Sequence, residues 1–143
     1  MNLSNGVKIT KVAAASSAGT STINGTTVDM TGFEGVLFVT TIGTANAGNI
    51  LKAQVGEKAD GSDAADLEGS AVVAEGNGSV VWLDIYRADP SQKYIRPVVV
   101  RGASTTVGEI YAIQYESRKQ VAGNNIENTI IGKLLVNPYE GTA

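Results

Sequence analysis

The chain contains no cysteine and no histidine among its 143 residues. Without cysteine it can form neither a disulfide nor a zinc site built on thiolates. Without histidine it lacks the commonest general base, the commonest transition-metal ligand and the ordinary pH switch near neutrality. Serine and threonine are plentiful, but no lysine is placed as a convincing base that would activate one of them as a nucleophile. We therefore expect a protein that is not an enzyme, with no catalytic residues, no metal and no cofactor.

Charge is also scarce. Charged residues make up 17% of the chain, compared with about 25% of an average soluble domain. The net charge is -3 and the pI is near 4.9, whereas nucleic-acid-binding proteins carry clustered lysine and arginine. No segment approaches the roughly 18 apolar residues of a membrane span, and residues 1–8 lack the pattern of a secretion signal. We expect neither nucleic acid nor a membrane as partner, and a protein made in a cytoplasm and then incorporated into something larger.

The residues that fill helix faces are few, whereas glycine (17 residues), alanine, valine and threonine are abundant. This composition favours short strands separated by turns. Strand patterns recur at short intervals, each bounded by Gly, Asn or Asp. The clearest cover residues 35–43, 49–56, 79–87, 93–102 and 107–117, and weaker ones cover 7–14, 22–30 and 70–74. We predict an all-β fold, a two-sheet β-sandwich that is jelly-roll-like and has about eight strands.

A chain of this length suits one domain with its own core. We expect the β-sandwich domain over residues 13–117, with an N-terminal segment or arm over 1–12 and a C-terminal segment or arm over 118–143. The last segment carries scattered aliphatic residues between asparagines and glycines. Ile130 and Leu134 are among the aliphatic residues that need a cover. Either the parent domain or a neighbouring subunit could supply it.

The alternation in residues 79–87 divides a strand between two faces. One face carries the aliphatic residues Val81, Leu83 and Ile85. The other carries Val80, Trp82, Asp84 and Tyr86. We expect Trp82 to fill a second core face between the sheets; the alternatives are a protein interface or a platform that stacks sugars, together with Tyr86 or Tyr94.

Proline is rare, with 3 residues in the chain. Pro97 falls inside the strand pattern at residues 93–102. Because proline cannot donate a ladder hydrogen bond, we expect it at an edge, a bulge or a strand end.

Acidic residues gather in the loop of sequence ADGSDAADLEG, residues 59–69. Its aspartates recur at every third position, whereas an EF-hand calcium loop uses alternate positions and a glutamate at the twelfth. A spacing of three stacks side chains along one side of a helical turn. We therefore predict a short helical turn near residues 62–68, capped by Ser62 or Asp63, with Leu67 turned toward the core. Calcium bound adventitiously or on assembly is the alternative.

The candidate interface residues combine three kinds of side chain. Tryptophan, tyrosine and arginine are enriched at protein interfaces. Acidic groups of the loop could meet basic groups across a subunit boundary, and aliphatic groups of the C-terminal segment need a cover. For Arg96 and Arg101 an internal salt bridge is an equal alternative. The full set is Asp63, Asp66, Trp82, Tyr86, Arg96, Arg101, Ile130 and Leu134.

Several blocks of the sequence, in this order, resemble a family of small structural proteins of tailed bacteriophages. The family pattern is a Gly-Phe-Glu-Gly strand, an Asp-Gly-Ser-Asp-Ala-Ala-Asp loop, an aspartate-aromatic-arginine strand, a Tyr-Ile-Arg strand and a Glu-Gly-Thr end. The matching blocks are VDMTGFEGVLFVTTIGT (28–44), ADGSDAADLEGSAVV (59–73), WLDIYRADPSQKYIRPVVVRG (82–102), IYAIQYESRK (110–119) and VNPYEGTA (136–143).

The resemblance implies a virion protein with a β-sandwich, most plausibly a head decoration (cement) protein. Such a protein would bind the major capsid protein lattice as a homotrimer on the outer surface of the capsid and stabilise the head. The family has no catalytic motif to carry over. The alternative is a tail, baseplate or head-fibre component, possibly with carbohydrate binding. The segment NNIENTIIGKLLV departs from the family pattern because it is richer in aliphatic residues.

Overall fold

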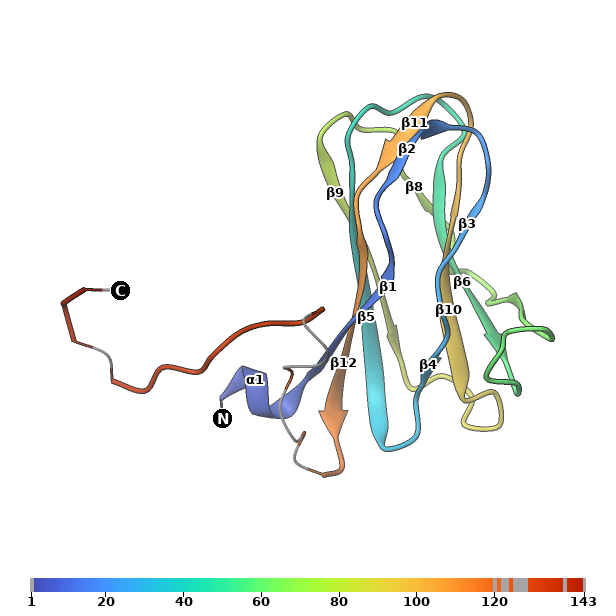
Figure 1. Ribbon diagram of the computed structural model, residues 1–143. Coiled ribbons are helices and arrows are strands. Elements are labelled where there is room, and N and C mark those ends of the chain that lie inside the picture. Colours follow the sequence, from blue (N-terminus) through green and yellow to red (C-terminus); the bar gives the residue numbers. More distant parts are fainter. Residues whose placement is uncertain (1, 120, 122–123, 125–128, 138, 143) are drawn as a thin grey trace.

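The computed structural model describes residues 2–119, 121, 124, 129–137 and 139–142. Within these residues the chain forms one short helix and twelve strands (Figure 1). In chain order they are α1 (Leu3–Gly6), β1 (Lys8–Ala13), β2 (Ser16–Gly19), β3 (Ile23–Asn24), β4 (Val28–Asp29), β5 (Phe33–Ile42), β6 (Ile50–Gly56), β7 (Ala65–Asp66), β8 (Val72–Val73), β9 (Ser79–Tyr86), β10 (Tyr94–Val100), β11 (Thr105–Val107) and β12 (Ile110–Ser117).

The strands form two antiparallel sheets that face each other, so the predicted all-β sandwich is confirmed (Figure 1). Several short strands continue one another along a single row of a sheet: β1 with β2, β3 with β4, β7 with β8, and β11 with β12. The first sheet then has the row order β9, β5, β12 with β11, and β1 with β2. The second has the order β3 with β4, β10, β6, and β7 with β8. Counted in rows, the described chain matches the expected number of strands.

The order of the rows is that of a folded hairpin. The row of β1 and β2 pairs with the row of β11 and β12, and the row of β3 and β4 pairs with β10. Further along the chain, β5 pairs with β9, and β6 pairs with the row of β7 and β8. This nesting of one long hairpin, bent so that its halves lie in two sheets, is the topology of a jelly roll. Alternation predicted strands and faces but carried no information on this pairing.

The core lies between the two sheets. Because successive side chains of a strand point to opposite faces, one set from each strand turns inward. Phe38, Ile95 and Ile110 are completely buried there. Burial of a side chain of this size stabilises the fold by roughly 1.5–3 kcal/mol. In β6 the buried set is Leu51, Ala53 and Val55, as the sequence predicted.

Pro97 lies in the middle of β10, at neither an edge nor a strand end. Its place follows from a break in the neighbouring row, since β10 pairs with β3 at Val98 and with β4 at Ile95. Between these pairings, Gly25 donates its amide proton to the Pro97 carbonyl at 2.8 Å. A side chain at Gly25 would approach the proline ring to 2.7 Å. The missing amide proton of Pro97 is therefore accommodated at an interruption of the ladder.

The predicted helical turn near residues 62–68 is wrong, because the loop from 57 to 69 contains turns and the two-residue strand β7. Asp63 accepts the amide protons of Glu57 and Lys58 at 2.9 and 3.2 Å. Its carboxylate therefore binds amides that precede it in the chain, whereas a helix cap binds amides that follow. Leu67 packs against the core, as expected, and its amide bonds to the carbonyl of Ala53.

The terminal segments behave differently from each other. Residues 8–12 of the expected N-terminal segment lie in β1, which pairs with β12. Residues 129–137, here called the C-terminal arm, run away from the sandwich beyond the end that carries α1 (Figure 1).

None of the helices described is both long and apolar enough to cross a bilayer.

Candidate functional site

The outer face of the first sheet is apolar and aromatic. Pairing register places its side chains in rows across β9, β5 and β12. Trp82 is opposite Val39, which is opposite Tyr111, and Tyr86 and Tyr115 flank Gly35 in the same way. We call this surface the aromatic face. Its members are Val80, Trp82, Tyr86, Leu37, Val39, Tyr111, Ile113 and Tyr115.

The expectation that Trp82 fills a core face is wrong, because its side chain is 60% exposed. The second sheet packs on the opposite side of β9, where Val81 and Ile85 are buried. Trp82 instead stands on the solvent side of an edge row. A tryptophan in this position is a large apolar group with an indole N–H donor available to a partner.

Two tyrosines of the aromatic face are held rigidly. The rings of Tyr86 and Tyr115 are parallel within 4°, with centroids 6.3 Å apart. Tyr115 donates its hydroxyl proton to Asp84 at 2.6 Å, and Tyr86 donates to Glu116 at 2.9 Å. Burial, and then the hydrogen bond to the Asp84 carboxylate and the surrounding negative charge, raise the pKa of Tyr115 above its ordinary value. The Tyr115 phenol therefore stays a neutral donor, and the two hydrogen bonds hold the pair of rings as a fixed platform.

Gly35 makes this arrangement possible. It lies on β5 between the two tyrosines, and a side chain there would overlap the ring of Tyr115. The Tyr115 ring covers the backbone that the glycine leaves bare, a pairing that stabilises glycine within strands. The second glycine of the Gly-Phe-Glu-Gly block is thus required for the packing of the aromatic face.

A shallow apolar groove lies beside the aromatic face, between β8 and β9. Its volume is about 530 Å³, and its walls include Val72, Val73, Val80 and Trp82. Val73 is 69% exposed and Val80 is 63% exposed. Two acidic residues, Glu75 and Asp84, also border it, and its lining contains no lysine or arginine. We call this surface the β8–β9 groove.

The outer face of the second sheet is polar. Gln54 links two of the predicted interface residues, since its side-chain oxygen accepts two hydrogen bonds from Arg96, at 2.9 and 2.7 Å, and its nitrogen donates to Asp66 at 2.8 Å. Lys52 forms a salt bridge with Asp66 at 2.7 Å. The hydrogen bond from Lys52, followed by that from Gln54, lowers the pKa of Asp66. The partner of Arg96 is thus the side-chain amide of Gln54. The sequence predicted either an acidic side chain in an internal salt bridge or a contact with a neighbouring subunit.

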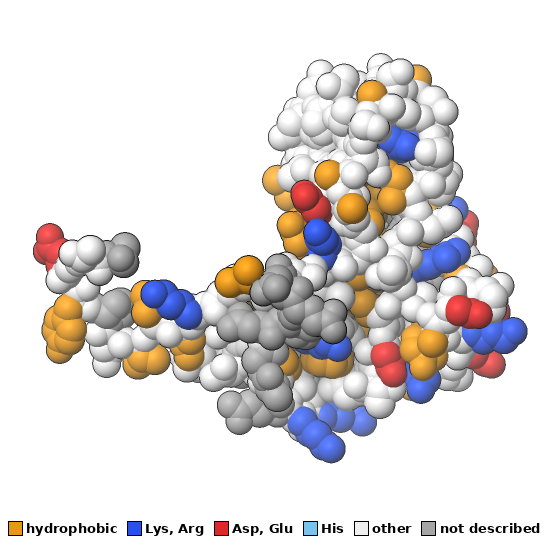
Figure 2. Space-filling model, viewed as in Figure 1, with side chains coloured by type: hydrophobic (Ala, Val, Ile, Leu, Met, Phe, Trp, Pro, Cys, Tyr) orange, Lys and Arg blue, Asp and Glu red, His pale blue; other side chains and the backbone are white. Residues whose placement is uncertain are grey.

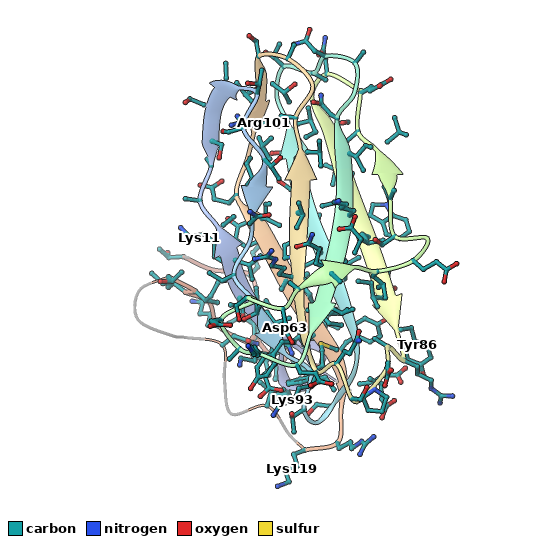
Figure 3. All side chains as sticks on the ribbon, turned by 90° about the vertical axis from the view of Figure 1, so that its right-hand side faces the viewer. Lys11, Asp63, Tyr86, Lys93, Arg101 and Lys119 are labelled. Atoms are coloured by element: carbon teal, nitrogen blue, oxygen red, sulfur yellow. The ribbon has the colours of Figure 1, made fainter. Side chains whose placement is uncertain are left out.

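Arg101 has neither of the two roles expected of it. It is only 8% exposed, and it lies toward the end of the sandwich where β2 and β11 meet (Figure 3). Its guanidinium donates to the carbonyls of Ser17, Ser21 and Thr105 and to the Ser21 hydroxyl, at 2.7–3.0 Å. These bonds use four of its five N–H donors. Arg101 therefore joins β2, β11 and the segment that follows β2 at that end of the fold.

The eight predicted interface residues thus do not form one surface. Trp82 and Tyr86 share the aromatic face, whereas Asp66 and Arg96 lie on the outer face of the other sheet, near the loop that holds Asp63. Ile130 and Leu134 belong to the C-terminal arm, half-buried and exposed respectively. Tyr115 and Val73 were not among the candidate residues predicted from the sequence. Alternation showed that Tyr111 and Tyr115 share one face of their strand. That this face also carries Trp82 depends on strand pairing, which the alternation does not show.

The described residues contain no group of three or more acidic side chains arranged to hold a metal ion. The loop aspartates instead accept local hydrogen bonds. Asp60 accepts the amide of Ser62 at 2.9 Å, in addition to the bonds of Asp63 and Asp66 given above. These aspartates therefore serve the geometry of the loop.

Comparison with known proteins gives one structural similarity. No family model matches the chain, and no curated protein matches it. The crystal structure of the SPBc2 prophage-derived protein YomS superposes with a TM-score of 0.48 and 12% sequence identity, covering 76% of this chain and 91% of that one. A similarity at this level carries no conclusion about function.

Proposed function

We propose that the chain is a non-enzymatic structural protein of a bacteriophage virion, a head decoration protein that binds the major capsid protein lattice from outside. The observation that carries the proposal is the amount of apolar surface left open on a small, well-packed domain. The aromatic face, the β8–β9 groove and the C-terminal arm all present large apolar side chains to solvent. Exposed apolar surface of this extent is typical of proteins that function in an assembly.

The sequence blocks that resemble phage structural proteins support the proposal. The first contains all of β5, with Gly35; the third contains β9 from Trp82 onward and all of β10; and the fourth contains all of β12. They therefore include β5, β12 and the part of β9 that carries Trp82 and Tyr86. The jelly roll itself is compatible with many functions, so the argument rests on the surface and the blocks.

The proposed mechanism is stabilisation by mass action. A protein that binds the assembled shell, and not its free subunits, stabilises the shell by its binding free energy. Each contribution of about 1.4 kcal/mol is a tenfold shift in an equilibrium constant. Repetition over the lattice and a trimeric arrangement would multiply this effect without a large interface in each subunit.

The experiment compares purified shells with and without the protein in a thermal rupture assay. Added protein should bind to the shells and raise their rupture temperature. Trp82→Ala should reduce the binding, while Glu68→Ala, at an exposed position of the acidic loop, should leave it unchanged. Equal rupture temperatures with saturating protein and without it would exclude the stabilising role.

A second candidate function is a tail, baseplate or head-fibre component that binds carbohydrate. The observation in its favour is the exposed Trp82 on the same sheet face as the fixed rings of Tyr86 and Tyr115. Sugars that stack on the indole should change the fluorescence of this tryptophan, which is the only one in the chain. A response to a glycan, with labelled protein found only at the tail of intact virions, would favour this function over decoration.

A further inference from the structure

The C-terminal arm is apolar, and several of its aliphatic side chains are exposed to solvent. Ile131 is 80% exposed, Leu135 is 60% exposed and Val136 is 70% exposed. The arm projects from the sandwich with apolar side chains along its length (Figures 1 and 2). Its sequence TIIGKLLVN contains one lysine, Lys133, and no acidic residue. A short aliphatic run of this kind forms a strand readily when a partner edge is available.

One edge of the first sheet is open. Among the described elements β9 pairs only with β5. Its eight residues pair in continuous register and include no proline, lysine or bulge. Proteins usually protect an exposed edge with such features, because its unpaired backbone groups are a template for another strand.

The opposite edge of the same sheet is protected. The register of β1 is interrupted between Lys11 and Ala13, and Lys11 is exposed there. The pairing of β2 with β11 also shifts register. Lys11 and Tyr86 mark the two opposite edges in Figure 3. The contrast identifies β9 as the edge at which a strand can add.

The surface beside β9 complements the arm in chemistry and length. The β8–β9 groove presents Val72, Val73 and Val80 to an incoming aliphatic strand. Its two charged residues are both acidic, Glu75 and Asp84, whereas the only charge of the arm is positive. The run from Lys133 to Val136 is long enough to pair with half of the eight residues of β9.

We propose that residues 133–136 of one copy add as a strand to β9 of a second copy, with aliphatic side chains in the β8–β9 groove and Lys133 beside its acidic rim. Backbone hydrogen bonds give such strand addition its affinity, and the pockets beside the edge give it selectivity. The contact is between two different surfaces, so its repetition gives a ring if the rotation between copies closes and an open filament if it does not. The inference does not depend on where the protein resides in a particle.

Cysteine cross-linking between copies tests the proposal, because the chain has no cysteine of its own. One copy carries Val80→Cys on β9, and a second, of different mass through an added tag, carries Leu135→Cys on the arm. Both positions are exposed, so neither substitution disturbs the core. The expected result is a disulfide-linked dimer of the two species under mild oxidation. The matched control replaces Val80→Cys by Ala18→Cys, an exposed position on β2 at the opposite edge, and should give little dimer.

Two results would overturn the proposal. The first is a yield with Ala18→Cys equal to that with Val80→Cys, or no dimer with either. The second is a Val80→Cys/Leu135→Cys double variant that closes its disulfide within one chain as efficiently when dilute as when concentrated, since the arm would then cover its own domain.

The charges provide a separate measurement on the uncross-linked protein. Lys133→Glu should weaken self-association roughly two- to fivefold in sedimentation equilibrium, the range for a surface ion pair. Adding Glu75→Lys should restore part of that loss. An unchanged association constant in Lys133→Glu would contradict the placement of Lys133 at the acidic rim.

Discussion

Tyr115 and Asp84 are joined by a 2.6 Å hydrogen bond although their strands, β12 and β9, are not neighbours. The strand between them is β5, and the bond crosses it beside Gly35. A single contact therefore connects three rows of the first sheet on its solvent side. The aromatic face is held by hydrogen bonds on the solvent side of the sheet, so substitutions there test its rigidity without changing the core.

Gly35→Ala should destabilise the fold by about 1–3 kcal/mol, because the added methyl group overlaps the Tyr115 ring and forces it aside. Urea unfolding measures the loss. Gly141→Ala is the control, since a side chain there meets no atom within 4 Å, and it should leave the free energy of unfolding unchanged. Equal stability of Gly35→Ala and the native chain would contradict the close packing of this ring.

The stability of the protein should fall in alkaline solution in a way that depends on Tyr115. Its folded-state pKa lies above the ordinary value of a tyrosine, near 10.0, so the folded state holds this proton more tightly than the unfolded state. The stabilisation is fully present below about pH 10 and is lost as the pH rises toward the folded-state pKa. Unfolding measured between about pH 8 and 11 should show the advantage of the native chain over Tyr115→Phe shrinking as the pH rises. A constant difference would contradict this linkage.

Asp63→Lys should loosen the acidic loop and leave self-association intact. The amide bonds from Glu57, and then Lys58, hold the pKa of Asp63 below its ordinary value, and the carboxylate faces its own loop. Limited proteolysis between residues 57 and 63 should be faster in this variant than in Glu68→Lys, which changes the same charge at another exposed position of the loop. Loss of oligomers in Asp63→Lys alone would place Asp63 at a subunit boundary.

The same loop should loosen in acid. Because the pKa of Asp63 is lowered by folding, its contribution is present above the ordinary value of 3.8 and is lost as the pH falls through the folded-state pKa. Proteolysis by an acid-active protease should therefore accelerate below about pH 4 in the native chain. An Asp63→Asn variant should show a smaller change over the same range.

Arg101→Ala should destabilise the fold by about 1–3 kcal/mol, because it removes a donor from the buried carbonyl of Thr105 and from the partly buried carbonyl of Ser17. Arg101→Lys should recover only part of this, since an ammonium group cannot reproduce the planar fork of donors. Arg118→Ala is the control, with a side chain that is 75% exposed and bonded to Glu34. Its effect should stay within about 0.5 kcal/mol.

Trp82→Ala should change the free energy of unfolding by no more than about 0.5 kcal/mol, because the side chain stands in solvent. Phe38→Ala, at a completely buried position, should cost about 3–5 kcal/mol. Thermal unfolding of the two variants makes the comparison. A large loss in Trp82→Ala would restore the interpretation of Trp82 as a core residue.

The sequence was sufficient for the parts of the fold that depend on local pattern. Alternation predicted the inward set of β6 and the two faces of β9. It could not decide which face of β9 meets the second sheet, because both carry large apolar groups, and Trp82 was therefore assigned to the wrong side. The answer depends on the pairing of β9 with β5 and on Gly35, which leaves room for tyrosines on the solvent side.

Polar residues were harder to place for a related reason. The spacing of the loop aspartates is compatible with a helical turn, but Asp63 binds amides that precede it once the loop folds back on β6. Arg101 was expected at an interface or in an internal salt bridge, because a charged arginine is seldom buried without an acidic partner. Its partners are carbonyls from segments about 80 residues earlier in the chain, a relation that no local pattern contains.

The most direct test of the central claim is a difference map between virions that carry the protein and virions that lack it. Decoration of the head predicts density on the outer surface of the capsid, repeated over the lattice, with a jelly roll in each copy. The aromatic face or the C-terminal arm should lie against the shell or a neighbouring copy. Density confined to the tail or baseplate, with a bare capsid, would contradict the account.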